Sequence, residues 1–233
     1  MSKGVKLGRG FRPDPGSFEP RGYSPRARSS SGPGLRQRKQ QRIRQQLTEA
    51  AFRLFTTRGF DTTSIDNIVD KVEVSRRTFF RYFGSKEQVV LAWLDQMGKD
   101  LRAELAHQPA DTHPFAALRQ VLTALAQQYA ANRKRTFAIA KLISETPSIG
   151  AHHREKLMTW ERGFAEELAA RLGAHPKRDM LPRLIASIGV NTLHIAVDTW
   201  IVEGGRRNLG ALVDEAFSIV EDELGFAPPA RTG

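Results

Sequence analysis

The second half of the chain repeats its hydrophobic residues with the period of an α-helix. From residue 114 onward the apolar positions recur every three to four residues, and no alternating apolar and polar run is long enough for a strand. Proline and glycine residues divide this pattern into five predicted helices, at residues 114–132, 134–145, 151–172, 181–203 and 209–224. Because the connections between them are short, the pattern predicts an all-α bundle.

The last two predicted helices distribute their apolar residues differently. Helix 209–224 carries a single stripe, made of Leu209, Leu212, Val213, Ala216, Phe217, Val220 and Leu224. Helix 181–203 is apolar around most of its circumference, so we expect it to be covered on more than one side.

Two longer helical patterns lie nearer the N-terminus. The first covers residues 35–58 and is ended by Gly59. The second covers residues 86–107 and joins the N-terminal part of the chain to the bundle.

Between these two helices the chain has the signals of two short helices joined by a tight turn. Thr63 followed by Asp66 indicates the start of the first, and Ser75 is placed as the N-cap of the second. Phe79 and Phe83, four residues apart, share the face that would anchor the second helix to a core. Gly84 is expected to end it in a left-handed conformation. This arrangement predicts a helix-turn-helix.

The formal net charge of +11 is concentrated in the same part of the chain. Residues 1–86 hold 19 Lys and Arg against 7 Asp and Glu, a balance of +12, whereas residues 87–233 hold 17 against 18, a balance of −1. Such a localised excess of cations is typical of a nucleic-acid-binding surface.

The absence of cysteine excludes disulfide scaffolds and Cys-ligated zinc. No apolar run approaches the ~18 residues of a membrane span, and no signal peptide is visible, so we expect a cytoplasmic protein without a membrane partner.

The second short helix carries the candidate DNA-reading residues. Its outward positions are Arg76, Arg77, Thr78, Arg81 and Tyr82. An α-helix fits the major groove, and arginine can hold the two acceptors of guanine at once. Lys86, at the start of the following helix, is expected to meet a phosphate oxygen together with free backbone amides. The simpler alternative is an amphipathic helix with a solvated basic face.

Two segments, AAFRLFTTRGFDTTSIDNIV at 50–69 and VSRRTFFRYFGSKE at 74–87, resemble the DNA-binding region of the TetR family of bacterial transcriptional regulators. The resemblance implies phosphate contacts by Thr63, Thr78, Phe80, Tyr82 and Lys86, and base or groove contacts by Arg76, Arg77 and Arg81. The family usually has glycine in the turn where this chain has Glu73. A positive φ there costs other residues about 1 kcal/mol, so the turn is expected to be strained or reshaped.

The resemblance also implies a domain organisation. It places a helix-turn-helix domain at residues 36–84 and a ligand-binding and dimerisation domain at 85–225, whose last two helices would form a four-helix interface with a second copy. Residues 1–35 and 226–233 are expected to be disordered. The N-terminal tail has seven cations and two acids, and it either follows DNA or is solvated without a partner. The residues nearest to the DNA would be Arg26, Arg28, Arg36 and Arg38.

Large apolar residues on the bundle helices are candidates for the wall of an effector cavity. They are Phe115, Leu122, Phe137, Trp160 and Phe164, and the alternative for each is ordinary core packing. Residues 183–224 are weakly similar to a TetR subgroup with acyl-CoA-like or other lipophilic ligands.

Helix 181–203 also carries a polar strip, formed by Arg183, Ser187, Asn191, His194 and Asp198. The strip could face solvent, a dimer interface or a ligand, in which case Asn191 and His194 are the candidate contacts. His194 and Asp198 alone do not make a metal site, and His152 and His153 are interpreted as a solvated pair.

No catalytic motif or cofactor-binding loop is present, so we expect neither an enzyme nor a cofactor. The leading hypothesis is a homodimeric, sequence-specific transcriptional regulator, most simply a repressor released from a near-palindromic DNA operator by a small, largely apolar effector. One alternative is an architectural DNA-binding protein without an effector. The other is a regulator that responds to a protein partner.

Overall fold

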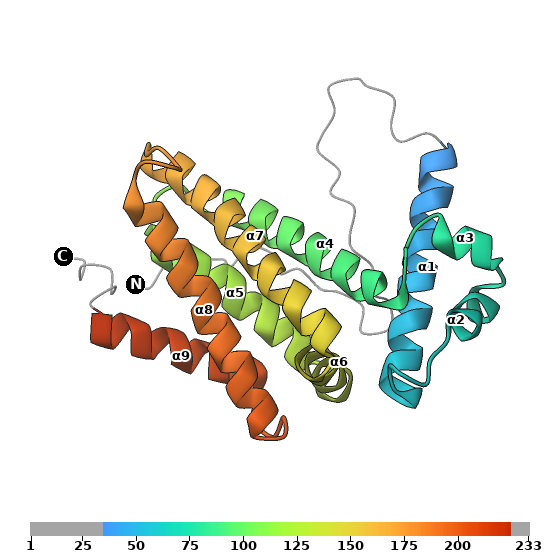
Figure 1. Ribbon diagram of the computed structural model, residues 1–233. Coiled ribbons are helices and arrows are strands. Elements are labelled where there is room, and N and C mark those ends of the chain that lie inside the picture. The colour runs from blue at the N-terminus through green and yellow to red at the C-terminus, as the bar shows by residue number, and fades with distance from the viewer. Residues whose placement is uncertain (1–34, 225–233) are drawn as a thin grey trace, which may run out of the picture.

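Within residues 35–224, which are the residues that the computed structural model describes, the chain forms nine α-helices and no strand (Figure 1). The helices are α1 (Leu35–Arg58), α2 (Ile65–Val72), α3 (Arg76–Phe80), α4 (Lys86–Ala106), α5 (Pro114–Ala130), α6 (Arg133–Glu145), α7 (Pro147–Leu172), α8 (Met180–Val202) and α9 (Leu209–Leu224). The all-α prediction is confirmed. The predictions for the N-terminal tail, including Arg26 and Arg28, and for the C-terminal end fall outside the described residues.

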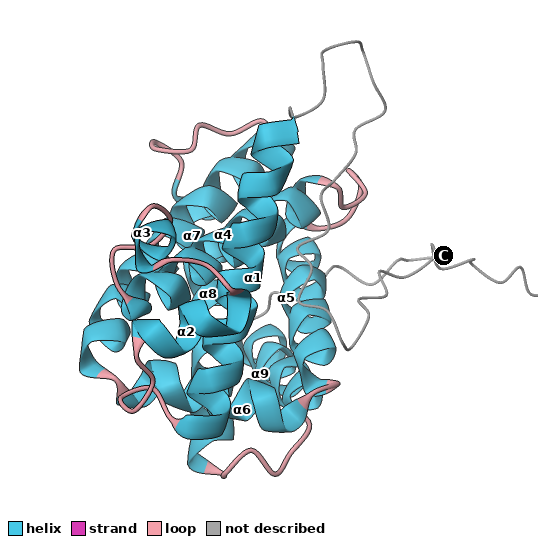
Figure 2. Cartoon of the chain, turned by 90° about the vertical axis from the view of Figure 1, so that its right-hand side faces the viewer, coloured by secondary structure: helices cyan, strands magenta, loops and turns pink. Residues whose placement is uncertain are grey.

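Helices α1, α2 and α3 gather at one end of the molecule, called the small end below, and α4 leads from them into the bundle of α5 to α9 (Figures 1 and 2). Leu47, Phe52 and Phe79 are fully buried at the small end, and Phe164 and Trp200 are fully buried in the bundle. These residues belong to one continuous apolar core. The end formed by α1 to α3 is therefore packed onto the bundle through α1 and α4.

Helix boundaries from the periodicity agree with the structure within a few residues, but two local details were wrong. The N-cap of helix α2 is Ser64. Its hydroxyl accepts a hydrogen bond from the Asn67 backbone amide, and the Asn67 side chain accepts one from the Ser64 backbone amide, both at 3.1 Å. The predicted start, Thr63 with Asp66, fails because the Thr63 hydroxyl donates instead to the Gly59 carbonyl at 2.7 Å. Gly84 is not left-handed, and α3 ends earlier, at Phe80.

Helix α8 is covered on one side only. It packs against α7, α9 and α5, and its buried face includes Ile185, Val190 and Trp200. The opposite face leaves several large apolar residues exposed, Leu181, Leu184, Ile195 and Val202. The second cover that the sequence predicts for this helix is absent from the described part of a single chain.

The statement that no apolar run is long enough to span a membrane needs correction for this same helix. Met180–Val202 is long and apolar enough to cross a bilayer by length and composition. Of that apolar stretch, 44% is buried inside the bundle. The helix also carries Arg183 and Asp198.

Candidate nucleic-acid interface and bundle cavity

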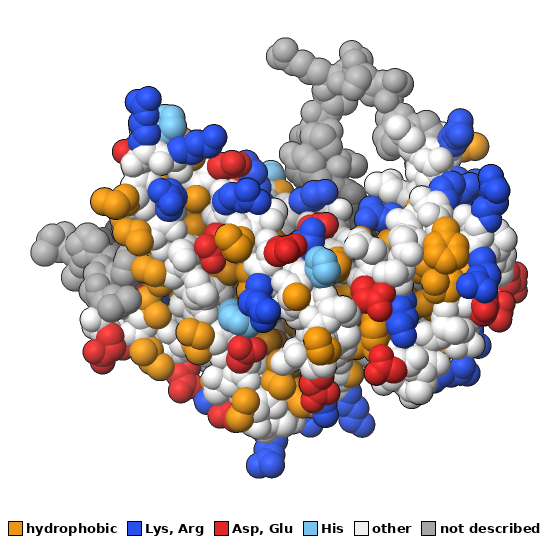
Figure 3. Space-filling model, viewed as in Figure 1, with side chains coloured by type: hydrophobic (Ala, Val, Ile, Leu, Met, Phe, Trp, Pro, Cys, Tyr) orange, Lys and Arg blue, Asp and Glu red, His pale blue; other side chains and the backbone are white. Residues whose placement is uncertain are grey.

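Helix α3 presents a cationic surface at the small end of the molecule. Its N-cap is Ser75, as predicted, because the Ser75 hydroxyl accepts from the Thr78 amide at 3.2 Å. Phe79 and Phe83 are buried beneath it, with exposed fractions of 0% and 3%. This anchoring turns Arg76, Arg77 and Arg81 outward, and all three are exposed. In Figure 3 lysine and arginine side chains gather over the end formed by α1 to α3.

The three arginines differ in what restrains them. Arg76 pairs with Asp66 of α2 at 3.4 Å, and Arg81 donates to the Tyr82 hydroxyl at 3.3 Å. Within residues 35–224, no side chain is within hydrogen-bond or ion-pair distance of the Arg77 guanidinium. Arg77 is therefore the arginine of α3 that is free to meet a base edge without breaking a contact.

The predicted phosphate contacts are placed unequally. Phe80 is 49% exposed on α3, and Thr78 and Tyr82 are half-buried beside it. Thr63 is only 1% exposed, and its hydroxyl already donates to the Gly59 carbonyl. In this structure Thr63 supports the loop between α1 and α2 instead of facing a duplex.

Lys86 is also held within the protein. Its ammonium donates to the carbonyl of Phe60 at 2.7 Å and lies 3.4 Å from those of Asp61 and Thr63, which matches the three donors of a lysine. The same ammonium lies 4.3 Å from the centre of the Phe60 ring. The Lys86 ammonium therefore contacts the α1–α2 loop in this structure, and its contact with phosphate stays a prediction. These carbonyls lie 23 to 26 residues away in the chain, so no local pattern around Lys86 predicts the contacts.

Glu73 sets the geometry of the turn between α2 and α3. It is the C-cap of α2, with φ 56° and ψ 44°, and it is the one non-glycine residue with positive φ in residues 35–224. A left-handed conformation at this position explains why glycine suits it. Of the two expected outcomes, the turn is therefore strained: Glu73 adopts the left-handed conformation at a cost of about 1 kcal/mol.

A cavity of about 300 Å³ lies inside the bundle. Trp93, Leu94 and Met97 of α4 form one wall of it, and the other walls come from α5 to α9. The residues contributed by α5 to α7 include Leu125, Tyr129, Ile139, Ile143, Leu157 and Trp160, and those from α8 include Leu193, Val197 and Ile201. The wall is largely apolar, which suits a small lipophilic molecule.

Of the predicted ligand contacts, the structure brings Trp160 and His194 to this cavity. The others lie elsewhere, which corrects their assignment. Phe115 packs against Phe217 of α9, and Phe137 packs edge-on against Trp200. Phe164 and Leu122 are fully buried core residues that do not line the cavity. Asn191 is exposed and bonded to Ser187 and Glu161 on the outside of the bundle.

The polar strip of α8 therefore divides between two environments. Its first three residues lie away from the cavity, whereas His194 and Asp198 line it together with His153 of α7. His194 Nε2 lies 3.4 Å from Asp198 Oδ2, and the His153 and His194 rings are 6.1 Å apart. Burial, with a further contribution from His194, lowers the pKa of His153 to about 4.

Sequence reasoning missed His153, which was grouped with His152 as a solvated pair. Only His152 is exposed, and its ring contacts the Ser148 carbonyl. His153 lies four residues before Leu157 and seven before Trp160, so helical spacing places all three on the face that lines the cavity. That spacing was the available signal.

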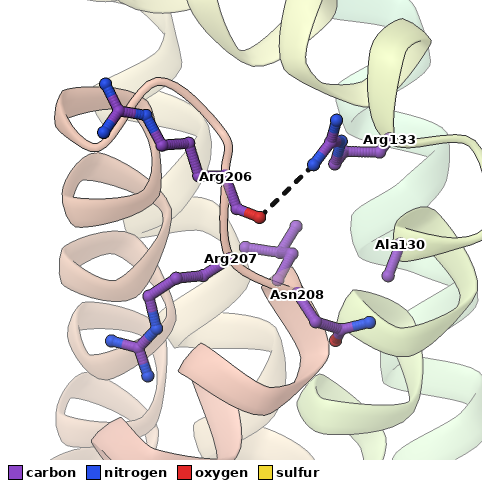
Figure 4. Close-up of a pocket in the computed structure, with 6 residues that line it drawn as sticks. Ala130, Arg133, Arg206, Arg207 and Asn208 are labelled. Atoms are coloured by element: carbon purple, nitrogen blue, oxygen red, sulfur yellow. Dashed lines mark hydrogen bonds between the residues drawn. The ribbon is translucent and has the colours of Figure 1, made fainter.

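A second, smaller recess of about 210 Å³ lies where the α8–α9 connection meets the start of α6, and Leu209 lines both spaces. Figure 4 shows that Arg133 donates to the Arg206 carbonyl, at 3.3 Å, whereas the guanidinium groups of Arg206 and Arg207 point away from Arg133. Arg207 is paired with Glu215 and Glu203. The arginines here connect segments of the chain and do not converge on a common point.

Comparison with known proteins identifies the two parts of the chain separately. Residues 47–93 match the family described as bacterial regulatory proteins, tetR family, and residues 112–225 match the MftR C-terminal domain. These two matches cover the α1–α3 end with the start of α4, and the bundle.

Full-length relatives give the same result. The chain is 33% identical to the transcriptional regulator TcmR of Streptomyces glaucescens, over 90% of this chain and 96% of TcmR. It is 25% identical to MftR of Mycobacterium tuberculosis, a putative mycofactocin biosynthesis regulator, over 77% and 87% of the two chains. Its fold is similar to that of FadR from Thermus thermophilus, a TetR-family repressor in complex with lauroyl-CoA, with a TM-score of 0.54, 25% identity and coverage of 82% and 100%.

These relatives are regulators of transcription, and none is named as an enzyme. Together with the exposed cations of α3 and the buried phenylalanines below them, the matches establish what the sequence resemblance suggested. The chain belongs to the TetR family of DNA-binding transcriptional regulators.

Proposed function

We propose that the protein is a cytoplasmic homodimeric repressor whose two α3 helices read a near-palindromic operator and which a small, largely apolar effector releases from DNA. The observation that carries this proposal is the exposed cluster of Arg76, Arg77 and Arg81 on a short helix fixed by two buried phenylalanines. Two such helices related by a two-fold axis meet successive major grooves about 34 Å apart.

The uncovered face of α8 supports the dimer. Leu184 is 54% exposed, Ile195 62% and Val202 87%, and Ile219 of α9 is exposed as well. Figure 3 shows hydrophobic side chains along the side of the molecule where α8 and α9 lie. Because monomeric proteins seldom expose large contiguous apolar surfaces, we assign this face to contact with a second copy.

The position of the cavity supports control by an effector. Trp93 of α4 lines the cavity and also packs edge-on against Phe52 of α1, with ring centres 5.1 Å apart. A molecule that favours one position of α4 therefore changes the placement of the DNA-binding end, to the extent that it binds one conformer more tightly. The lauroyl-CoA held by FadR of T. thermophilus is in line with an effector that has an apolar body.

The cavity favours a small molecule over a protein partner, which would require no internal space.

Sequence-specific reading is distinguished from architectural binding by experiment. Sites are selected from random DNA, and the affinity for the selected site is compared with that for a scrambled duplex of the same length and composition. A repressor is expected to prefer its site by at least ~10³, whereas equal affinities would refute operator recognition.

A further inference from the structure

His153 is a half-buried polar residue of the cavity wall whose ring has no hydrogen-bond partner within the described part of the chain. No side chain or carbonyl in residues 35–224 is within hydrogen-bond distance of its ring nitrogens. Its contact with His194 is between rings, at 6.1 Å. An imidazole has one donor and one acceptor nitrogen in its neutral form, so His153 has unused hydrogen-bonding capacity.

The other polar groups of the wall differ in burial and in what they contact. The Thr136 hydroxyl donates to the Tyr129 carbonyl at 2.8 Å. Asp198 is more than half exposed and faces His194, and Arg154 is exposed. Burial raises the pKa of Tyr129 on α5, so its phenol is neutral and can meet a ligand. The indole N–H of Trp160 is buried without a partner as well, and it can only donate.

Charge restricts which molecule fits beside His153. The charged residues that line the cavity are Arg154 and Asp198, one of each sign, so the cavity supplies no net charge to offset a buried ion. His153 itself is uncharged at neutral pH, because burial keeps its pKa low. A buried ion without a partner is strongly disfavoured. A hydroxyl group, in contrast, can donate to the imidazole nitrogen that accepts or accept from the nitrogen that donates.

We infer that the effector is an uncharged, largely apolar molecule carrying a hydroxyl group, which hydrogen-bonds to His153 while its body fills the space between Trp93, Trp160 and Leu193. This inference rests on the effector role proposed for the cavity and narrows the class of ligand. His194 of α8, which lies 3.4 Å from Asp198, lines the cavity beside His153.

Three probes with the same rigid body test this assignment, namely naphthalene, 2-naphthol and 2-naphthoate. Their binding to the full-length protein is measured by equilibrium dialysis at neutral pH. We expect 2-naphthol to bind about tenfold more tightly than either of the others, as one added neutral hydrogen bond in a dry site allows. In His153→Phe this preference is lost while the affinity for naphthalene is retained.

Matched variants locate the contact. His152→Phe makes the same substitution at the exposed neighbour and is expected to keep the preference for 2-naphthol. Tyr129→Phe tests another neutral polar group. If Tyr129→Phe abolished the preference and His153→Phe did not, the assignment to His153 would be overturned.

The probes also separate failure of this inference from failure of the proposed function. Binding of naphthalene without a preference for 2-naphthol, or tighter binding of 2-naphthoate, would refute the hydroxyl ligand and leave the effector cavity standing. Binding of none of the three would refute both.

Discussion

The Lys86 ammonium lies 2.7 Å from the Phe60 carbonyl oxygen and 4.3 Å from the centre of the Phe60 ring. Lys86 is the first residue of α4, and Phe60 lies in the loop that leads into α2. The bond therefore joins the helix that lines the bundle cavity to the segment that places α2 and α3. We therefore propose that Lys86 positions α3, the proposed DNA-reading helix.

Replacing Lys86 with methionine tests this role. The change keeps the aliphatic stem and removes the bonds to the carbonyls, so we expect operator affinity to fall by about tenfold. A residue that contacts phosphate contributes about 0.9 to the slope of log affinity against log salt, whereas a positioning residue leaves the slope unchanged. The measurement is a salt titration of operator binding.

Lys71→Met, at an exposed lysine of α2, controls for the loss of one charge near the DNA. If the salt slope were shallower in Lys86→Met than in this control, with thermal stability unaltered, Lys86 would be shown to contact phosphate, which would contradict the positioning role.

The left-handed conformation of Glu73 predicts a stabilising substitution. Glycine adopts φ near 56° without the steric cost that a side chain incurs, so Glu73→Gly is expected to raise the free energy of unfolding by about 1 kcal/mol. Glu73→Gln removes the charge but keeps the strain and should leave stability nearly unchanged. Urea denaturation of the three proteins decides, and equal gains from both substitutions would show that charge, not backbone conformation, is responsible.

Arg77 is expected to contribute most to base preference among the arginines of α3, since it alone is unrestrained within the described part of the chain. Arg77→Ala should cost about 1–3 kcal/mol at particular positions of the operator and little on other sequences. Affinities for a set of single-base operator variants measure this. A uniform loss over all variants would instead assign Arg77 to the phosphate backbone.

Charge placed on the exposed face of α8 should separate the two copies. Ile195→Glu puts a carboxylate into the proposed interface, where it would be buried without a partner, and is expected to produce monomers with much weaker operator binding. Leu172→Glu makes the same change at an exposed position of α7 and serves as the control. Sedimentation velocity gives the oligomeric state, and a persistent dimer in Ile195→Glu would place the interface elsewhere.

His153 predicts how stability depends on pH. Its pKa is about 4 in the folded chain and about 6.5 when unfolded, so below pH 6.5 the unfolded state binds a proton that the folded state does not. The free energy of unfolding should therefore fall as the pH drops from about 6.5 to 4, by at most about 3 kcal/mol. In His153→Phe this component disappears, while His152→Phe retains it. Denaturation at several pH values checks the prediction, which fails if the two variants behave alike.

The periodicity of the chain was enough to predict the helices, and the N-cap Ser75 was visible as a residue type at the expected spacing. These features depend on interactions within one or two turns. The placement of Phe79 and Phe83 could be predicted for the same reason, because a four-residue spacing puts both on one face.

Features that depend on contacts between distant segments were not predictable in this way. Lys86 carries an ammonium that suits phosphate, but its partners are backbone carbonyls 23 to 26 residues earlier in the chain, which tertiary packing brings to the start of α4. Likewise Phe115 and Phe137 have the size and spacing of cavity residues, and only the docking of α9 and α8 directs them into the core. Residue type identified candidates, and tertiary packing decided among them.

Footprinting of guanine N7 atoms on a selected operator tests the paired α3 helices most directly, because N7 lies in the major groove where arginine would bind it. We predict two protected patches about one helical turn apart, with two chains per duplex, and loss of N7 protection in both patches with Arg77→Ala. A single protected patch, one chain per site, or protection confined to the minor groove would contradict the account.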